Sequence, residues 1–395
     1  MVSARLAVLA VAAASIFNGV CALPQAMDKR MATVTQVVRP VVKVFVVVDQ
    51  DGNTISYSRS TVQPDATPSP KPRRRKSKTS ATTTTPPAPA LDIVETSAPA
   101  PAQTSQSSGG STDPAPVADG KLGLGIVYSP YHDNQMCKDT ATVESEIAAI
   151  AASGGGYNWL RIYGVDCDQV ANVVTAAWNH QLKVMLGIYN VEDDAAFNAD
   201  LSSLVSQVKT AMTATGKKDW SGIAFISVGN EVVNQNPGNA EATVSKLLSY
   251  AAITRKTVQA EGYTGSVGNT DVWIWYKTYP QLCGEDNLVM INMHPFFDGN
   301  CDVASSGAFL KTHLAEIQAA CGADKQVIIS ETGWPNAGDA MGVAIPGQPE
   351  QAQFLQLAAS NLDTYMLLTA YDEGWKPATP SVERHWGILG SSPSH

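Results

Sequence analysis

The 395-residue sequence has few charged residues and lacks the short motifs that mark common metal and nucleophile sites. Asp, Glu, Lys and Arg make up 16% of the chain, and neither a C-x-x-C pair nor an H-E-x-x-H segment occurs. This absence argues against a zinc site. No G-x-S-x-G segment is present either, which argues against the nucleophile elbow of an esterase. We therefore expect chemistry that needs no metal and no organic cofactor.

Long hydrophobic runs are scarce as well. The run at residues 6–17 follows Arg5, is too short to span a bilayer comfortably, and leads to small residues before Leu23. This is the layout of a secretory signal peptide, so we predict a signal at residues 1–22, cut after Ala22. A membrane anchor is the less favoured alternative. Since no later run reaches about eighteen apolar residues, we expect a secreted, extracellular protein with no membrane partner.

Basic charge is in short supply in most of the chain. Residues 1–120 carry 12 Lys and Arg against 8 Asp and Glu, whereas residues 121–395 carry 15 against 28, a net charge of −13. An acidic domain of this kind does not favour nucleic acid or other polyanions, so we expect no nucleic-acid partner. A neutral polymer is a good candidate ligand.

Residues 23–120 lack the apolar side chains that a core requires, apart from a β-prone patch at residues 31–60. The remainder is rich in Ser, Thr, Pro and Ala, which predicts a disordered or extended leader with O-linked glycans. The patch predicts a hairpin around residues 51–53. Lys29-Arg30 is a candidate processing site, and the basic run at residues 73–76 could be another or could contact anionic wall or membrane material.

Residues 121–395 alternate short apolar runs with segments of helical periodicity, which predicts a parallel sheet covered by helices. Eight repeats in this length predict one (β/α)8 (TIM) barrel domain. A doubly wound open sheet is the alternative, but it would need a Gly-rich loop after the first strand. The expected strands are 122–129, 159–165, 183–189, 223–229, 266–272, 288–293, 327–330 and 366–371.

Acidic and aromatic residues follow all eight of these runs, and two carboxylates stand out among them. Glu231 ends "ISVGNE" and Glu331 ends "IISE". In a barrel the carboxyl ends of the strands share one mouth, so both acids should face a common cleft. Glycoside cleavage needs one protonated and one ionised carboxyl group, and unequal burial can produce that difference. The nearby polar residues Asn230, His294 and Asn336 could bind sugar hydroxyls.

Other interpretations of these residues are weaker. Either glutamate could form a structural ion pair with Arg161 or Lys325 instead. Ser330 and His294 lie on neighbouring strands, but Ser330 is expected to point opposite to Glu331, away from the lumen mouth, which disfavours a serine nucleophile.

Five cysteines remain after the signal. Cys137 and Cys167 follow early strands, and Cys283 and Cys321 both precede strands. In an oxidising compartment we expect these two pairs to form disulfides, with Cys301 left over.

Several segments together resemble glycoside hydrolase family 17, in its fungal cell-wall branch. They are "LGIVYSPY", "WLRIYGVDC", "ISVGNEVV", "VMINMHPFF", "SETGWPNAG", "YDEGWK" and "ERHWGI", and the resemblance covers about residues 121–395. Members of this branch are secreted, wall-associated enzymes that act on β-1,3-glucan, some described as wall glucosidases and others as surface mannoproteins.

The resemblance implies a retaining double displacement in which Glu231 is the general acid/base and Glu331 is the nucleophile. It also implies carboxyl groups roughly 5–5.5 Å apart. Water as the acceptor would give hydrolysis and a glucan hydroxyl would give transfer, and both outcomes share these residues. Trp334 is expected to form a wall of the sugar site. The expected substrate-binding residues are Tyr163, Asn230, Trp334, His294 and Trp375, with Glu373 and Lys376 as further candidates.

The expected partner is thus β-glucan, and a monomer is the default. The main competing hypothesis is a structural or adhesive wall mannoprotein whose barrel binds glucan without cutting it. A third hypothesis places the working part in residues 31–120, as a secreted antigen or interaction protein.

Overall fold

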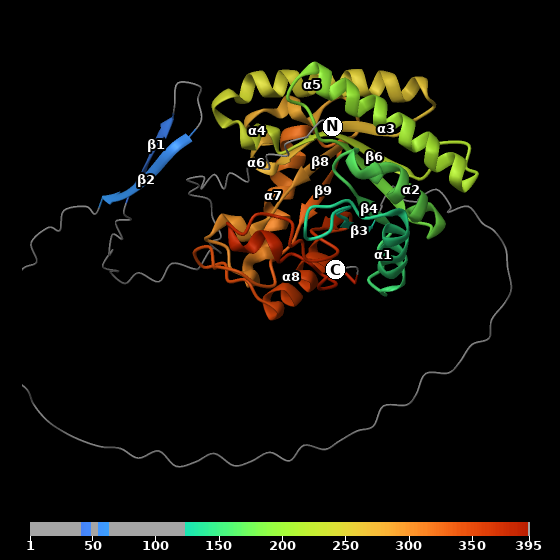
Figure 1. Ribbon diagram of the computed structural model, residues 1–395. Helices are drawn as coiled ribbons and strands as arrows, with labels where there is room; N and C mark the ends of the chain where they lie inside the picture. The colour runs from blue at the N-terminus through green and yellow to red at the C-terminus, as the bar shows by residue number, and fades with distance from the viewer. Residues whose placement is uncertain (1–40, 49–53, 63–122, 394–395) are drawn as a thin grey trace, which may run out of the picture. The chain divides into compact units, whose positions relative to one another are not determined.

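The structure is a computed structural model and describes residues 41–48, 54–62 and 123–393. The strands β1 (Val41–Val48) and β2 (Thr54–Val62) pair antiparallel (Figure 1), which confirms the predicted hairpin. The hairpin and the barrel belong to separate units of the chain. The predicted signal peptide, the processing site at Lys29-Arg30, the basic run at 73–76 and the Ser/Thr/Pro-rich stretch lie outside the described residues.

Eight parallel strands close into a barrel in the order β10-β3-β4-β5-β6-β7-β8-β9, so the predicted (β/α)8 barrel is confirmed and the open sheet is excluded. Closure depends on β10, which pairs with both β3 and β9. Each strand overlaps one of the predicted runs. Their bounds are β3 (Leu124–Val127), β4 (Trp159–Arg161), β5 (Lys183–Ile188), β6 (Ile223–Asn230), β7 (Ser266–Val272), β8 (Leu288–Asn292), β9 (Gln326–Thr332) and β10 (Tyr365–Leu367).

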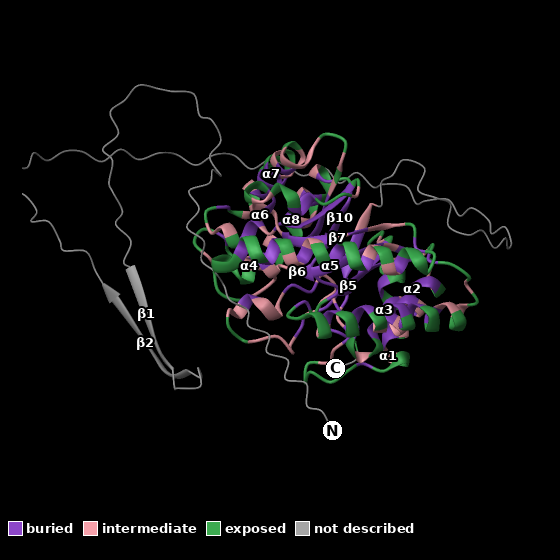
Figure 2. Cartoon of the chain, turned by 90° about the horizontal axis from the view of Figure 1, so that it is seen from above, coloured by how far each residue is buried: buried purple, intermediate pink, exposed green. Residues whose placement is uncertain are grey.

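Helices surround the barrel, with buried inner faces and exposed outer faces (Figure 2). The α-helices are α1 (Thr140–Ala152), α2 (Gln169–Asn179), α3 (Asp194–Thr215), α4 (Val232–Gln235), α5 (Ala240–Ala260), α6 (Trp273–Thr278), α7 (Ser306–Cys321) and α8 (Gln348–Asn361). Short 3-10 turns are η1 (Asp166–Asp168), η2 (Pro237–Asn239), η3 (Pro280–Cys283), η4 (Pro295–Asp298), η5 (Val303–Ser305) and η6 (Ser381–Arg384). Among the described helices, none has the length and hydropathy needed to cross a bilayer.

The inside of the barrel has an apolar layer and a polar layer. The apolar layer contains Trp159, Met185, Phe225, Leu288, Met290, Ile328 and Met366. Because side chains alternate along a strand, the next inward position of β4 is Arg161 and that of β8 is Asn292. Both side chains are almost completely buried. The strands therefore carry polar groups toward their carboxyl ends above a closed hydrophobic floor.

Two disulfides link segments at the ends of the strands and helices, and both were predicted. Cys137 pairs with Cys167 and Cys283 pairs with Cys321, across 30 and 38 residues of sequence. Cys301 is in neither disulfide and is buried. Loops of this length let a disulfide stabilise a fold by about 3–4 kcal/mol, by restricting the unfolded chain.

Candidate active site

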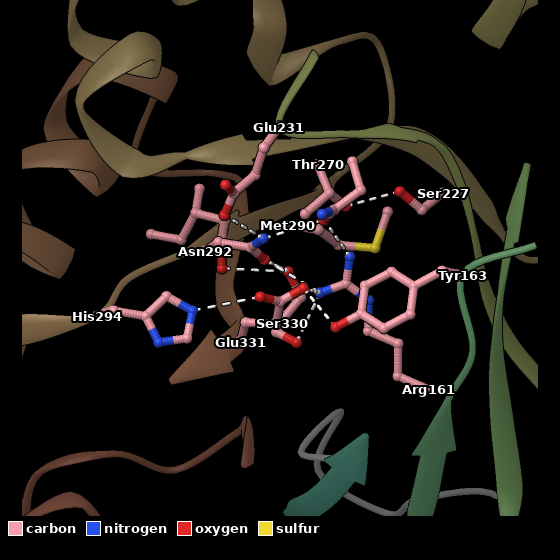
Figure 3. Close-up of polar contacts among 12 residues, drawn as sticks. Arg161, Tyr163, Ser227, Glu231, Thr270, Met290, Asn292, His294, Ser330 and Glu331 are labelled. Carbon is pink, nitrogen blue, oxygen red and sulfur yellow. Dashed lines mark hydrogen bonds and ion pairs between the residues drawn. The ribbon is translucent and has the colours of Figure 1, made fainter. Parts of the chain in front are cut away.

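Glu331 and Glu231 lie at the carboxyl end of the barrel, on β9 and directly after β6 (Figure 3). Glu331 is 5% exposed and Glu231 is half-buried. One carboxylate oxygen of each, together with a ring nitrogen of His294, lie within 4.8 Å of one another. The two acids therefore face each other, as the sequence predicted.

Three donors hold the Glu331 carboxylate. Arg161 Nη1 lies 2.9 Å from Oε1, and the Tyr163 hydroxyl donates to the same oxygen at 2.6 Å. His294 Nε2 is 3.2 Å from Oε2. Arg161 and Tyr163 come from β4 and the residues just after it, and His294 follows β8. In the closed barrel β8 is adjacent to β9, whereas β10 and β3 separate β4 from β9. His294 therefore contacts the carboxylate from the adjacent strand, and Arg161 and Tyr163 reach it across the barrel.

These contacts determine the ionisation of Glu331. Burial alone would raise its pKa, but the Arg161 guanidinium, and then the His294 and Tyr163 hydrogen bonds, lower the pKa to about 2. The carboxylate is consequently ionised across the pH range in which proteins are stable. An ionised, immobilised carboxylate is suited to attack an electrophilic carbon.

Glu231 has the opposite environment. Burial, and then the negative charge of Glu331, raise the pKa of Glu231 above its usual value. Asn292 Nδ2 donates to Glu231 Oε1 at 2.9 Å and opposes this effect only in part. A carboxyl group of raised pKa retains its proton at higher pH and can donate it to a leaving group.

Asn292 and Arg161 connect the two acids through one polar network (Figure 3). Arg161 donates to Asn292 Oδ1 at 3.0 Å and to Asn230 Oδ1 at 2.8 Å, and Asn292 also donates to Asn230 Oδ1 at 3.0 Å. The alternative ion pair between Arg161 and Glu331 thus exists, but as part of this site. Lys325 donates instead to the Gly284 and Asp286 carbonyls and pairs with neither glutamate.

Glu231, His294 and Glu331 are also a possible set of metal ligands within residues 123–393. However, Glu331 Oε1 already accepts two hydrogen bonds, one from a guanidinium at 2.9 Å. A fixed positive charge at that distance repels a divalent cation. The donor set therefore fits paired-acid chemistry better than metal binding.

The structure brings Tyr163, Asn230 and His294 together with the two acids, whereas the two predicted tryptophans pack against other aromatic side chains. Trp375 packs 4.9 Å from the Tyr131 ring and lines a cavity with Tyr131 and Glu373 at the same end of the barrel. Trp334 has no exposed surface. Its Nε1 donates to the Ile345 carbonyl at 2.8 Å, so it does not form the wall of a sugar site as predicted.

Ser330 was also placed wrongly by simple strand alternation. Its hydroxyl donates to the Ile291 carbonyl at 3.1 Å and contacts Asn292 Oδ1 at 3.1 Å, so it lies in the lumen beneath Glu331. The register between β8 and β9 shifts so that Asn292 faces Glu331. This irregularity lets consecutive residues both serve the site. Ser330 is buried in this network, which leaves it no access to a substrate.

Three buried polar residues of the strands were not predicted from the sequence as parts of the structure around the acids, namely Arg161, Asn292 and Asp271 of β7, whose carboxylate accepts from Val233 N. Each is a polar side chain at most 1% exposed within a strand of apolar or small neighbours. Such a residue requires a partner in the interior, because an unpaired buried polar group is costly. A search for strongly polar residues inside the predicted strands would have found all three.

The chain matches one protein family and is similar to several known proteins. The family described as "BtgE/BtgC glycoside hydrolase domain" matches residues 125–387. The cell surface mannoprotein MP65 of Candida albicans is 36% identical over 269 residues, 68% of this chain and 66% of that protein. A Saccharomyces cerevisiae protein named "Probable family 17 glucosidase SCW10" is 36% identical over 269 residues, 68% of this chain and 64% of its own. The match thus spans slightly less than two thirds of these relatives.

A solved structure shares the barrel. It is an active-site mutant of the Rhizomucor miehei β-1,3-glucanosyltransferase in complex with laminaritriose. It is similar with a TM-score of 0.56 at 22% identity, and the likeness covers 68% of this chain and 94% of that chain. This similarity supports the fold.

Proposed function

Since the chain belongs to the BtgE/BtgC glycoside hydrolase domain family, we propose that it acts on β-1,3-glucan by a retaining double displacement. The resemblance to glycoside hydrolase family 17 is confirmed by this family and by a relative named as a family 17 glucosidase. The substrate proposal is supported by the resemblance and by the laminaritriose bound to the similar glucanosyltransferase.

The observation that carries the proposal is the pair of acids with opposite pKa shifts in one mouth. The pKa of Glu331 is lowered to about 2 and that of Glu231 is raised. Their nearest oxygens lie within 4.8 Å. Retaining glycosidases hold their acids roughly 5–5.5 Å apart, whereas inverting ones leave about 6.5–9.5 Å for a water molecule. The separation therefore supports retention.

In the first step, Glu331 attacks the anomeric carbon and forms a glycosyl ester while the glycosidic carbon–oxygen bond breaks. The proton of Glu231 passes to the departing oxygen. In the second step, the Glu231 carboxylate takes a proton from the acceptor, whose oxygen bonds to the anomeric carbon and releases Glu331. Arg161 and Tyr163 keep Glu331 ionised and oriented, and Asn292 orients Glu231.

Hydrolysis and transfer differ only in the acceptor of the second step, so we propose cleavage as the basic activity and transfer to a glucan hydroxyl as a second outcome. We also propose an extracellular, cell-wall location, in line with the name of the cell surface mannoprotein relative. The acidic barrel domain argues for a neutral polysaccharide partner and against nucleic acid. We propose that the protein acts as a monomer.

The test is product analysis on reduced β-1,3-glucan oligosaccharides with the full chain and its Glu231→Gln and Glu331→Gln variants. Wild type is expected to change the length distribution, with shorter products from hydrolysis and longer ones from transfer. Both variants should lose this activity. If folded wild type binds the glucan and leaves its length unchanged, the proposal is wrong and the barrel is a glucan-binding wall component instead.

A further inference from the structure

Helix α4 begins in an unusual way, directly at Glu231. This residue is the N-cap of the helix and has a left-handed backbone, with φ 55° and ψ 31°. An N-cap side chain ordinarily accepts a hydrogen bond from the second or third N–H of its helix. The Glu231 side chain makes no such bond. Another group must therefore accept hydrogen bonds from the backbone N–H groups in the first turn of α4.

Asp271 on β7 supplies that group. Its Oδ2 accepts from Val233 N at 2.8 Å and its Oδ1 accepts from Asn234 N at 3.2 Å. Oδ1 also accepts from Val272 N at 2.9 Å. The side chain is 0% exposed. A buried carboxylate from the neighbouring strand thus caps α4 in place of the N-cap residue itself.

Capping of α4 by Asp271 affects the orientation of the Glu231 side chain. Because Asp271 satisfies the helix, the Glu231 carboxylate is free to turn to the barrel mouth, where Asn292 donates to it at 2.9 Å. The Glu231 N–H donates to the Thr270 carbonyl at 2.9 Å, and its own carbonyl accepts from Gln235 N at 2.9 Å. Strand β7 therefore fixes the backbone on both sides of the Glu231 side chain: Thr270 binds the N–H of Glu231, and Asp271 binds the N–H groups of Val233 and Asn234.

The buried Asp271 carboxylate has no cationic side chain as an ion-pair partner among the described residues. Among the described residues no Lys, Arg or His forms an ion pair with it, and only backbone N–H groups neutralise it. Burial, and then the charge of Glu231, raise the pKa of Asp271 to about 7. The other titratable neighbour is Tyr276 of α6. A buried acid with no cation costs stability, so its position next to the acid/base calls for a functional reason.

We propose that Asp271 is the positioning residue for Glu231, holding the acid/base in its left-handed conformation and its carboxyl group in line with the scissile oxygen. This inference rests on the proposed function, because it assigns Asp271 a part only in reactions that need Glu231. Asp271 itself touches neither the mouth nor Glu331. Its effect on the reaction is therefore exerted through Glu231 alone.

Asp271→Asn tests the proposal, because the amide keeps one acceptor oxygen but turns its NH2 toward a backbone N–H. On β-1,3-glucan oligosaccharides kcat should fall by about 10²-fold, the usual effect of displacing a catalytic group by about 1 Å. KM should stay within a factor of about two, since the bound ground state does not need the proton. Adding Asp271→Asn to Glu231→Gln should cost little more, because the two changes act on the same step.

A second readout separates positioning from a loss of folded structure. Dinitrophenyl β-laminaribioside has a leaving group that departs without a proton, so formation of the glycosyl-enzyme no longer needs the acid. The dinitrophenolate burst should therefore be nearly unchanged in Asp271→Asn, while cleavage of the glucan falls. A general structural defect would lower both. If Asp271→Asn does not fold, Asp271→Ser, which keeps a capping oxygen, takes its place in both measurements.

The matched control is Asp193→Asn, which alters another helix cap. Asp193 caps α3 by accepting from Ala196 N at 2.9 Å. This variant should retain wild-type kcat on both substrates. Full activity of Asp271→Asn on glucan, or additive losses with Glu231→Gln, would overturn the positioning role. A wild type inactive on glucan would instead defeat the proposed function, so the two failures are distinguishable.

Discussion

Glu231 and Glu331 are the same residue type at equivalent strand ends, and they differ in almost everything else. Glu331 sits within β9 and accepts hydrogen bonds from Arg161 and Tyr163. Glu231 sits one residue past β6 in a left-handed turn, and its side chain accepts from the neutral amide of Asn292. One lies beside a buried cation and the other does not. The difference shows that neighbouring side chains, rather than residue type, give the two carboxyl groups the opposite pKa shifts on which their proposed acid and nucleophile roles depend.

The largest effect is expected from removing the ionised partner. Glu331→Gln removes the attacking oxygen while keeping the side-chain volume, so kcat/KM on β-1,3-glucan should fall by roughly 10⁴-fold or more. Single-turnover assays would measure this loss. Glu316→Gln, on the exposed side of α7, is the matched control and should keep full activity. A Glu331→Gln variant with more than a tenth of wild-type activity would remove Glu331 from the mechanism.

Removal of the protonated partner should have a smaller effect that depends on the leaving group. Glu231→Gln should lower glucan cleavage by about 10²–10⁴-fold, the usual contribution of a general acid. Azide should partly restore turnover of an activated aryl glycoside, because a small anion needs no base to attack the glycosyl-enzyme. The product would be a glycosyl azide of unchanged anomeric configuration. If azide instead rescues Glu331→Gln and gives a glycosyl azide of unchanged configuration, the two roles are exchanged, because only attack on a glycosyl-enzyme preserves the configuration.

Arg161→Gln should reduce the difference between the pKa values of Glu331 and Glu231, because it removes the cation beside Glu331. The pKa of Glu331 is about 2 because Arg161 opposes the effect of burial, so the pKa should rise when Arg161 is lost. The acidic limb of kcat/KM should then move up by about 1–3 pH units. Arg255→Gln, which breaks ion pairs with Glu285 and Asp286 away from the mouth, should leave the limb in place. An unmoved limb in Arg161→Gln would contradict this account.

The smallest expected effect is on stability. The pKa of native Glu231 is raised, so the native state holds this proton more tightly than the unfolded chain. Wild-type stability should therefore fall as pH rises from the unfolded pKa through the native one. Glu231→Gln removes this cost and should be more stable at pH 7 by about 0.5–2 kcal/mol. The difference in Tm between Glu231→Gln and wild type should vanish near pH 4. If the Tm of Glu231→Gln at pH 7 is equal to or lower than that of wild type, ionised Glu231 does not destabilise the native state.

The sequence allowed much of this comparison to be predicted. Apolar runs and helical periodicity located the strands, and acids at two strand ends located Glu231 and Glu331. The surroundings were harder to predict, because Arg161 and Asn292 are single polar residues inside apolar runs. They lie on β4 and β8, which are not adjacent, so their hydrogen bond forms only when the sheet closes into a barrel. Ser330 was misplaced because a register shift between β8 and β9 has no signature in two-residue periodicity.

Trp334 shows a different limit. Its place just after a catalytic strand suggested a sugar-binding wall, but the loop that follows folds over it, and Ile345 accepts from its indole. Phe296 and Phe354 pack against the same ring. Position along a strand indicates which end of the barrel a residue occupies. It does not indicate whether later segments cover it.

The most direct test of the central claim is the anomeric configuration of the first product. Proton NMR of wild-type protein acting on a β-1,3-glucan oligosaccharide, recorded before mutarotation, would measure it. We predict β-configured reducing ends or transfer products, because two successive displacements at the same anomeric carbon preserve its configuration, and the oxygens of the two acids lie within 4.8 Å of each other. Initial release of the α-anomer would mean a single displacement, and the nucleophile role of Glu331 would be wrong.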